Sequence, residues 1–121
     1  MGVALQRIKV LVATKPDSLY RVIEHLLKDQ SDFEITRYAE DEAALTRHIR
    51  ETRPGLVIVS SHYLHDGNLQ RNYGERRSHK LILVHYFEEF SKPIDPKAFD
   101  AYLTDEVLVA RLSSTVRHML L

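Results

Sequence analysis

Five short apolar runs recur along the chain, separated by longer polar stretches. They lie at residues 7–13, 33–39, 55–61, 80–86 and 99–104. Their spacing is too wide for hairpins and is typical of strand–helix–strand units. Within the first and third runs the apolar residues are consecutive rather than alternating, as in parallel strands that are covered on both faces. The pattern therefore predicts a central parallel sheet.

Apolar residues at helical spacing predict helices within residues 14–30, 40–54 and 105–121. Thr14 is a candidate N-cap of the first helix, with Pro16 in its first turn. The predicted buried faces comprise Leu19, Val22, Ile23, Leu26 and Leu27 in the first helix, Ala44, Leu45, His48 and Ile49 in the second, and Leu108, Leu112, Val116 and Met119 or Leu120 in the third.

Two connections have a weaker pattern. Residues 65–80 contain Gly74 and few apolar residues, which leaves room for a short helix at most, and Pro93 and Pro96 forbid a regular helix through residues 87–99. The order of elements predicts a flavodoxin-like, doubly wound, five-stranded parallel sheet in a single α/β domain over residues 1–121, with a short or irregular fourth helix.

Composition narrows the classes of function. The chain has 17 basic and 17 acidic residues, so no net charge draws it to nucleic acid or to an acidic membrane. Zero cysteines exclude thiolate chemistry and the common structural zinc sites. No stretch has the pattern of an export signal or a membrane span, and no glycine-rich loop follows the first strand to hold a cofactor phosphate. We therefore expect a cytoplasmic protein without a cofactor.

Two stretches that each combine a predicted strand with the loop after it have a recognisable pattern. "VLVATKPDSL" and "GLVIVSSHYLHDG" combine an apolar run with a loop that contains Pro in the first and Asp-Gly in the second. With the order of elements, they resemble the receiver domain of bacterial response regulators over nearly the whole chain. In that family an acidic pair follows the first strand and a phosphoacceptor Asp ends the third. Here the acidic pair falls on Ala13 and Thr14, and Ser60 takes the place of the acceptor.

The later motifs extend the resemblance. "LILVHYF" is similar to the fourth strand of receivers, where His85 replaces a Thr or Ser that senses the phosphoryl group. "FDAYLTDEV" is similar to the fifth strand, where Tyr102 matches an aromatic switch residue and Asp105-Glu106 replace a Lys-Pro pair. The scaffold positions match and the chemical positions do not. We call Ala13, Thr14, Ser60, His85 and Asp105 the degenerate pocket.

These substitutions remove the charges that receiver chemistry needs. Magnesium prefers carboxylate oxygens, and the phosphoryl group needs a nearby cation. Thr14 and Ser60 offer neutral hydroxyls, and Asp105 puts an anion where the cation belongs. The resemblance therefore implies a pseudo-receiver that is not an enzyme and is not phosphorylated. Ser60 could still be a kinase substrate, although a hydrogen-bonded structural serine is the simpler interpretation.

An aromatic group lies late in the chain: Phe87, Phe90, Phe99 and Tyr102. One interpretation is a face that, with the final helix, binds a signalling partner or a second copy of the chain. The other is that these rings fill the core where a regular helix is missing. The sequence leaves both open.

The alternative function uses the histidines near the predicted carboxyl ends of the strands. His62, His65 and His85 with Asp105 could hold a metal ion or a small molecule, but their spacing follows no established ligand signature. An enzyme of another type on this fold is a third hypothesis, because a fold does not fix a function.

Overall fold

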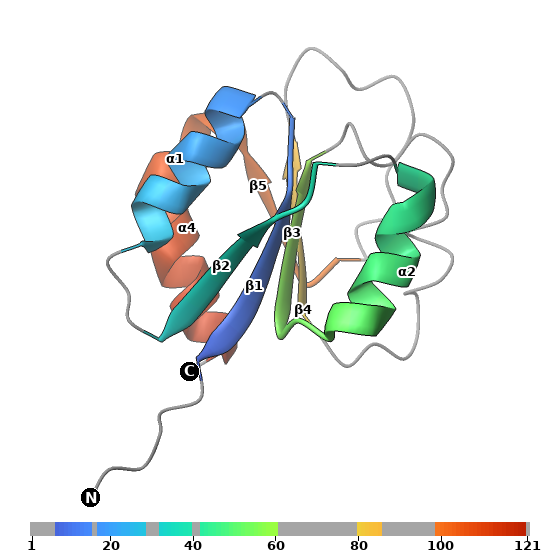
Figure 1. The fold of residues 1–121 in the computed structure, drawn as a ribbon. Helices are drawn as coiled ribbons and strands as arrows, with labels where there is room; N and C mark the ends of the chain where they lie inside the picture. The colour runs from blue at the N-terminus through green and yellow to red at the C-terminus, as the bar shows by residue number, and fades with distance from the viewer. Residues whose placement is uncertain are drawn as a thin grey trace, which may run out of the picture.

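The computed structural model describes residues 7–15, 17–28, 32–39, 42–60, 80–85 and 99–120, with the backbone alone at Glu42, Ala43, His85 and Asp105. The elements are β1 (Ile8–Ala13), α1 (Asp17–Leu27), β2 (Phe33–Arg37), α2 (Glu42–Thr52), β3 (Leu56–Ser60), β4 (Lys80–His85), β5 (Ala101–Thr104) and α4 (Asp105–Leu120). Figure 1 shows their arrangement. The predicted elements at 65–80 and 87–99 lie outside the described residues, apart from Lys80 and Phe99.

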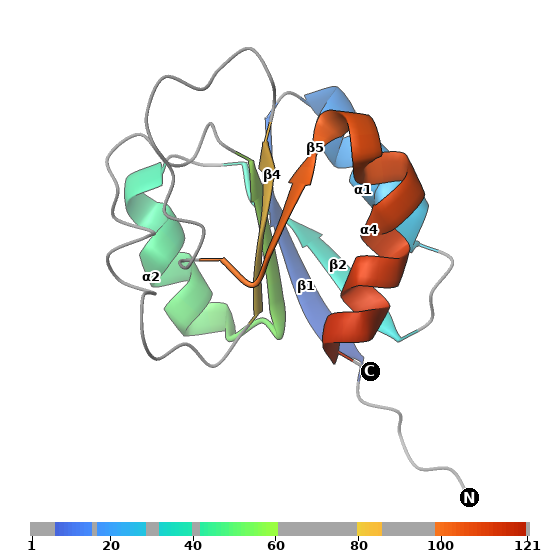
Figure 2. The same ribbon diagram turned by 180° about the vertical axis from the view of Figure 1, so that it is seen from behind.

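All five strands run parallel in the order β2-β1-β3-β4-β5. Helices α1 and α4 cover one face of this sheet and α2 covers the other (Figures 1 and 2). This is the flavodoxin-like, doubly wound order, so the predicted fold class is confirmed. In the described part of the chain, no helix combines the length and the apolar character needed to cross a bilayer.

The two core layers follow from the alternation of side chains along each strand. Val10 and Val12 of β1 point toward α1 and α4, whereas Leu11 and Ala13 point toward α2. The central strand β3 is fully buried on both faces. This two-sided burial is the reason why the sequence shows consecutive apolar residues there.

Helix α1 differs from its predicted buried face at one position. Leu19, Ile23 and Leu27 are buried and Leu26 is partly buried, as predicted, but Val22 is 38% exposed. Val22 lies about 100° around the helix from Ile23, the middle of the buried stripe, and is therefore on the flank of the helix, where its side chain reaches solvent. The prediction that Val22 is buried is wrong.

Side-chain hydrogen bonds join elements that are distant in sequence. The Ser113 hydroxyl of α4 donates to the backbone oxygen of Leu26 in α1, at 3.1 Å. Asp100, just before β5, donates its backbone N–H to the Leu81 oxygen, and its Oδ2 accepts the Leu81 N–H, each at 2.8 Å. Asp100 thus continues the pairing of β4 with β5 by one residue.

The connection from α2 to β3 forces the chain through an unfavourable conformation. Arg53 has a φ of 49°, in the left-handed region that residues with a side chain seldom occupy. Its N–H still bonds to the Ile49 oxygen at 2.9 Å, as in a helix C-terminal cap. At Gly55 an added Cβ would lie 2.9 Å from Cγ2 of Ile8, so any larger residue here would have to displace the Ile8 side chain.

We predict opposite effects for two arginine-to-glycine changes in this region. Arg53→Gly should raise the free energy of unfolding by about 1 kcal/mol, because glycine adopts positive φ without strain. Arg50→Gly, an exposed position inside α2, should lower it by about 1 kcal/mol through lost helix propensity. Urea unfolding of both variants checks the pair. A destabilised Arg53→Gly protein would contradict the assigned cap conformation.

Candidate functional site

Strand register brings the degenerate pocket to one edge of the sheet. Ala13 pairs with Val59, so Thr14 and Ser60 follow side by side at the ends of β1 and β3. Ser60 in turn pairs with Val84, which places His85 next along β4. His85 pairs with Thr104, the last residue before Asp105. These are the carboxyl ends of the strands, where doubly wound sheets bind their ligands.

Ser60 has a structural hydrogen bond. Its side chain is fully buried, and its Oγ accepts the backbone N–H of Lys15 at 3.1 Å. The bond fixes the connection from β1 to α1 against the end of β3. Such an enclosed hydroxyl does not present itself to a kinase, and the structure favours the interpretation of Ser60 as a hydrogen-bonded structural serine.

Thr14 is buried beside Ser60 but serves no cap. It is 3% exposed, and its Oγ1 has no hydrogen-bond partner. The predicted N-cap role of Thr14 is wrong, because α1 begins only at Asp17 and the hydroxyl bonds to no helix N–H. An unsatisfied buried hydroxyl costs about 1–3 kcal/mol, so Thr14 is a point of weakness in this edge.

The described part of the pocket is electrically neutral. Ala13 is a fully buried methyl group, and Thr14 and Ser60 contribute uncharged hydroxyls. Among the described residues, no group of three His, Cys, Asp or Glu side chains could hold a metal ion. His62, His65 and the side chains of His85 and Asp105 lie outside the described part, so the metal hypothesis stays a prediction.

The carboxylate of Asp17, in the first turn of α1, is held by arginines. Asp17 forms ion pairs with Arg37, at the end of β2, and with Arg21, whose Nε lies 3.2 Å from Oδ2. The Arg37 guanidinium also lies over the Tyr20 ring, 4.7 Å from its centre. No pattern in the sequence points to Arg37, because this contact depends on how β2 ends beside α1.

Tyr20 completes this cluster. Its hydroxyl donates to Glu24 Oε2 at 2.9 Å. Burial raises the pKa of Tyr20, and the hydrogen bond and the negative charge of Glu24 raise it further. Asp17 and Tyr20 therefore already have local partners, and we interpret the cluster as the attachment of α1 to β2 rather than as part of a reactive site.

The aromatic residues of the predicted interaction face separate into two kinds. Tyr102 of β5 is 43% exposed, and burial of part of its side chain raises the pKa of its hydroxyl, which stays neutral at ordinary pH. Phe99 is 7% exposed and packs in the core layer beneath α2, so its ring fills the core and is not part of a surface. Phe87 and Phe90 lie outside the described residues.

No protein-family model matches the sequence, and a comparison with curated proteins gives no match. Solved structures do match. A DNA-binding response regulator of the LuxR family from Staphylococcus aureus is 22% identical, with a TM-score of 0.69 over 92% of this chain and 97% of that one. The response regulator domain of CheB from Thermotoga maritima is 16% identical, with a TM-score of 0.69 over 93% and 96%.

A protein assigned to pilus assembly, from Burkholderia thailandensis, has the same architecture. It is 14% identical, with a TM-score of 0.66 over 92% of this chain and 96% of that one. The structural neighbours are thus mainly response-regulator receiver domains of similar length. At these identities the likeness establishes the fold, and the residues of the pocket must decide the chemistry.

The two buried hydroxyls of the pocket should respond oppositely to removal. Thr14→Val replaces an unsatisfied hydroxyl by a methyl group of the same shape and should stabilise the protein by about 1 kcal/mol. Ser60→Ala strips the Lys15 N–H of its acceptor and should destabilise it by about 1–2 kcal/mol. Thermal and urea unfolding measure both. A destabilised Thr14→Val protein would mean that the hydroxyl has a partner after all.

Proposed function

We propose that this chain is a pseudo-receiver, a signalling or regulatory domain that works through protein contacts and without phosphorylation. One observation carries the proposal. At the edge where receivers hold their acidic residues, the structure has a buried methyl group and two buried neutral hydroxyls, at Ala13, Thr14 and Ser60. The receiver fold supports the signalling role, and this edge supports the loss of the chemistry.

Phosphoryl transfer to this pocket lacks two requirements: negatively charged side chains and an accessible nucleophile. Phosphoryl transfer to a receiver Asp depends on a carboxylate nucleophile and on a divalent ion held by further carboxylates. Neutral hydroxyls provide neither the nucleophile nor the negative charge that binds magnesium. The Ser60 oxygen also accepts the N–H of Lys15, so it is engaged in holding the backbone.

The proposed contact face centres on Tyr102 at the free edge of the sheet, on the α2 side of β5, because its neighbours Ala101 and Leu103 pack toward α1 and α4. Tyr102 is one of few large apolar side chains exposed in the described residues, with Val22 and Val109. An exposed, neutral tyrosine on an edge strand is well suited to bury its ring against a partner while its hydroxyl stays hydrogen-bonded. We propose that the partner is a signalling protein or a second copy of this chain.

Exposure to a small phosphodonor with magnesium tests the chemical half of the proposal. We expect no covalent adduct on the intact protein by mass spectrometry, under conditions that phosphorylate a competent receiver domain run in parallel. The Ser60→Asp variant should also stay unmodified, because one carboxylate does not restore the metal site. An adduct on the wild-type chain that disappears in Ser60→Ala would overturn the proposal.

Sedimentation velocity at several concentrations tests the contact face as a self-association site. Tyr102→Asp should weaken association by about tenfold or more, because it places a charge in the centre of the contact. Val22→Asp is the matched control on α1 and should leave association unchanged, since Val22 is similarly exposed on a different surface.

A third variant distinguishes the edge of the sheet at β5 from the surface formed by α1 and α4. Val109 is 68% exposed and lies one turn before Ser113, whose hydroxyl bonds to Leu26 of α1, so it belongs to the flank near α1. If Val109→Asp and Val22→Asp weaken association and Tyr102→Asp does not, the contact is made by α1 and α4, and the face proposed here is wrong. If the chain stays monomeric at all concentrations, the proposed partner is a different signalling protein. Tyr102→Asp should then weaken the complex between this chain and that protein.

A further inference from the structure

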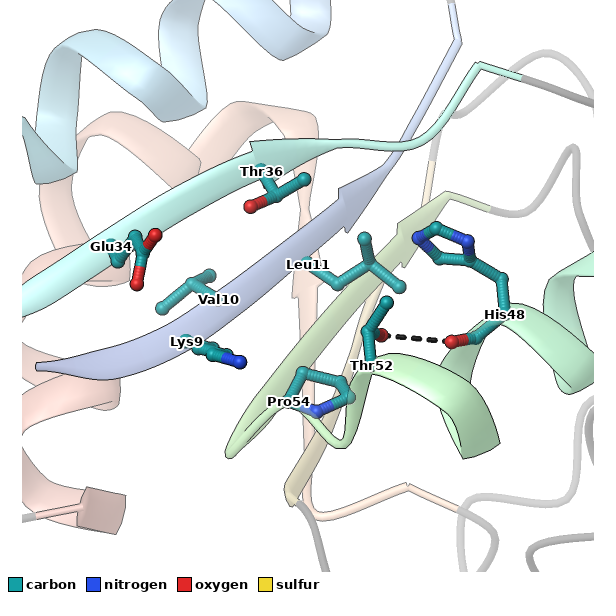
Figure 3. A pocket seen from close by; sticks show the side chains of 8 residues that line it. All are labelled: Lys9, Val10, Leu11, Glu34, Thr36, His48, Thr52 and Pro54. Carbon is teal, nitrogen blue, oxygen red and sulfur yellow. Dashed lines mark hydrogen bonds between the residues drawn. The ribbon is translucent and has the colours of Figure 1, made fainter.

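A groove lies near the edge of the sheet opposite to β5, between α2 and the strands β1 and β2. It has a volume of about 140 Å³. Figure 3 shows its lining side chains, which come from both strands, from α2 and from the turn that follows it. The residues that line it are Lys9, Val10, Leu11, Glu34, Thr36, His48, Thr52 and Pro54.

The parallel register of β1 and β2 builds one wall of this groove. Lys9 pairs with Glu34, and Leu11 pairs with Thr36, so these four side chains form a square on the face of the sheet that α2 covers. Their neighbours Val10 and Ile35 point to the opposite face, toward α1 and α4. A polar array of Lys9, Glu34 and Thr36 therefore lies beside Leu11 on the α2 side of this strand pair.

Helix α2 leaves this array partly open. Its buried residues Leu45 and Ile49 pack into the core layer with Leu11 and Val57, over β1 and β3. Glu34 and Thr36 of the edge strand stay exposed, whereas Pro54 is buried beneath the groove. The second wall is the flank of α2 that carries His48 and Thr52 (Figure 3).

One nitrogen of the His48 imidazole is buried without a hydrogen-bond partner. This nitrogen is Nε2, and the ring extends from α2 toward the strands (Figure 3). The other contacts of the residue are made elsewhere: its backbone oxygen accepts the Thr52 hydroxyl at 2.8 Å, and its ring lies 5.1 Å from that of Tyr38. In either neutral tautomer Nε2 must donate or accept, so the empty position costs about 1–3 kcal/mol.

Lys9 and Glu34 present opposite charges to the same groove. They are register partners on adjacent strands, yet within the described residues neither forms an ion pair with the other or with a third side chain. An ammonium and a carboxylate that line one groove from paired backbone positions, without pairing with each other, match a molecule with both charges. Each protein charge then meets the opposite charge of the ligand.

We propose that the groove binds a small zwitterion of the α-amino acid class. Its carboxylate pairs with Lys9, its ammonium with Glu34, and a polar group of its side chain bonds to His48 Nε2 over the apolar floor of Leu11 and Pro54. A volume of about 140 Å³ fits a molecule of roughly six to nine heavy atoms, near the size of benzene, which fills a cavity of about 150 Å³. The site is independent of the degenerate pocket and of Tyr102.

Amide chemical shifts of the full chain, titrated with defined probes, test this site. The probes are L-threonine and L-asparagine as zwitterions within this size range, glycine as a zwitterion without a side chain, and acetate and methylammonium as ions of a single charge. At least one zwitterion should give saturable shifts at Leu11, Thr36 and Thr52, with a Kd at least about tenfold below that of either single ion. Lys9→Gln and Glu34→Gln should each weaken this binding by about tenfold.

Two controls keep the result specific. Arg47→Gln, on the exposed surface of α2 outside the groove, should leave the Kd unchanged, and its melting curve should match those of the Lys9 and Glu34 variants. His48→Phe keeps an aromatic ring against Tyr38 and should remove the preference for L-threonine and L-asparagine over glycine. No saturable shift up to about 20 mM zwitterion, or equal affinity for acetate, would overturn the proposal.

Discussion

Strand β3 and residues 10–13 of β1 are hydrogen-bonded on both edges and buried on both faces, and the rest of the structure is arranged around this constraint. Strands of this kind need apolar residues at consecutive positions and helices on both sides of the sheet. They also fix the register of their neighbours, since a shift of one residue would turn every side chain to the wrong layer. The position of both sites in the molecule follows from that register.

This constraint explains which parts of the fold could be predicted from the sequence. Consecutive apolar residues identify buried parallel strands directly, and helical spacing identifies α1, α2 and α4, so the topology followed from their order. A wrong prediction at Val22 and an open alternative at Phe99 both arose where a local pattern has two outcomes. A valine on the flank of an apolar stripe can face either way, as Val22 does, and an aromatic residue before an edge strand can cover a surface or enter the core, as Phe99 does.

The sites required contacts that no local pattern contains. The sequence located the edge with Ala13, Thr14 and Ser60, because the ends of the apolar runs mark the ends of the strands. It did not show that Ser60 accepts the Lys15 N–H or that the Thr14 hydroxyl has no partner, since both depend on the packing of β1 against β3. The groove was missed for the same reason: Lys9 and Glu34 become neighbours only through the pairing of β1 with β2.

The groove and the proposed contact face are connected by one core layer. Leu11, beneath the groove, belongs to the same buried cluster as Leu83 and Phe99, and Leu83 is the register partner of Tyr102. Packed layers of this kind transmit strain because they have few voids to absorb it. A shared core layer does not by itself allow ligand binding in the groove to regulate the contact face. A bound zwitterion can change the contact face only if it has different affinities for two arrangements of α2 on the sheet, and the size of any effect is limited to that difference.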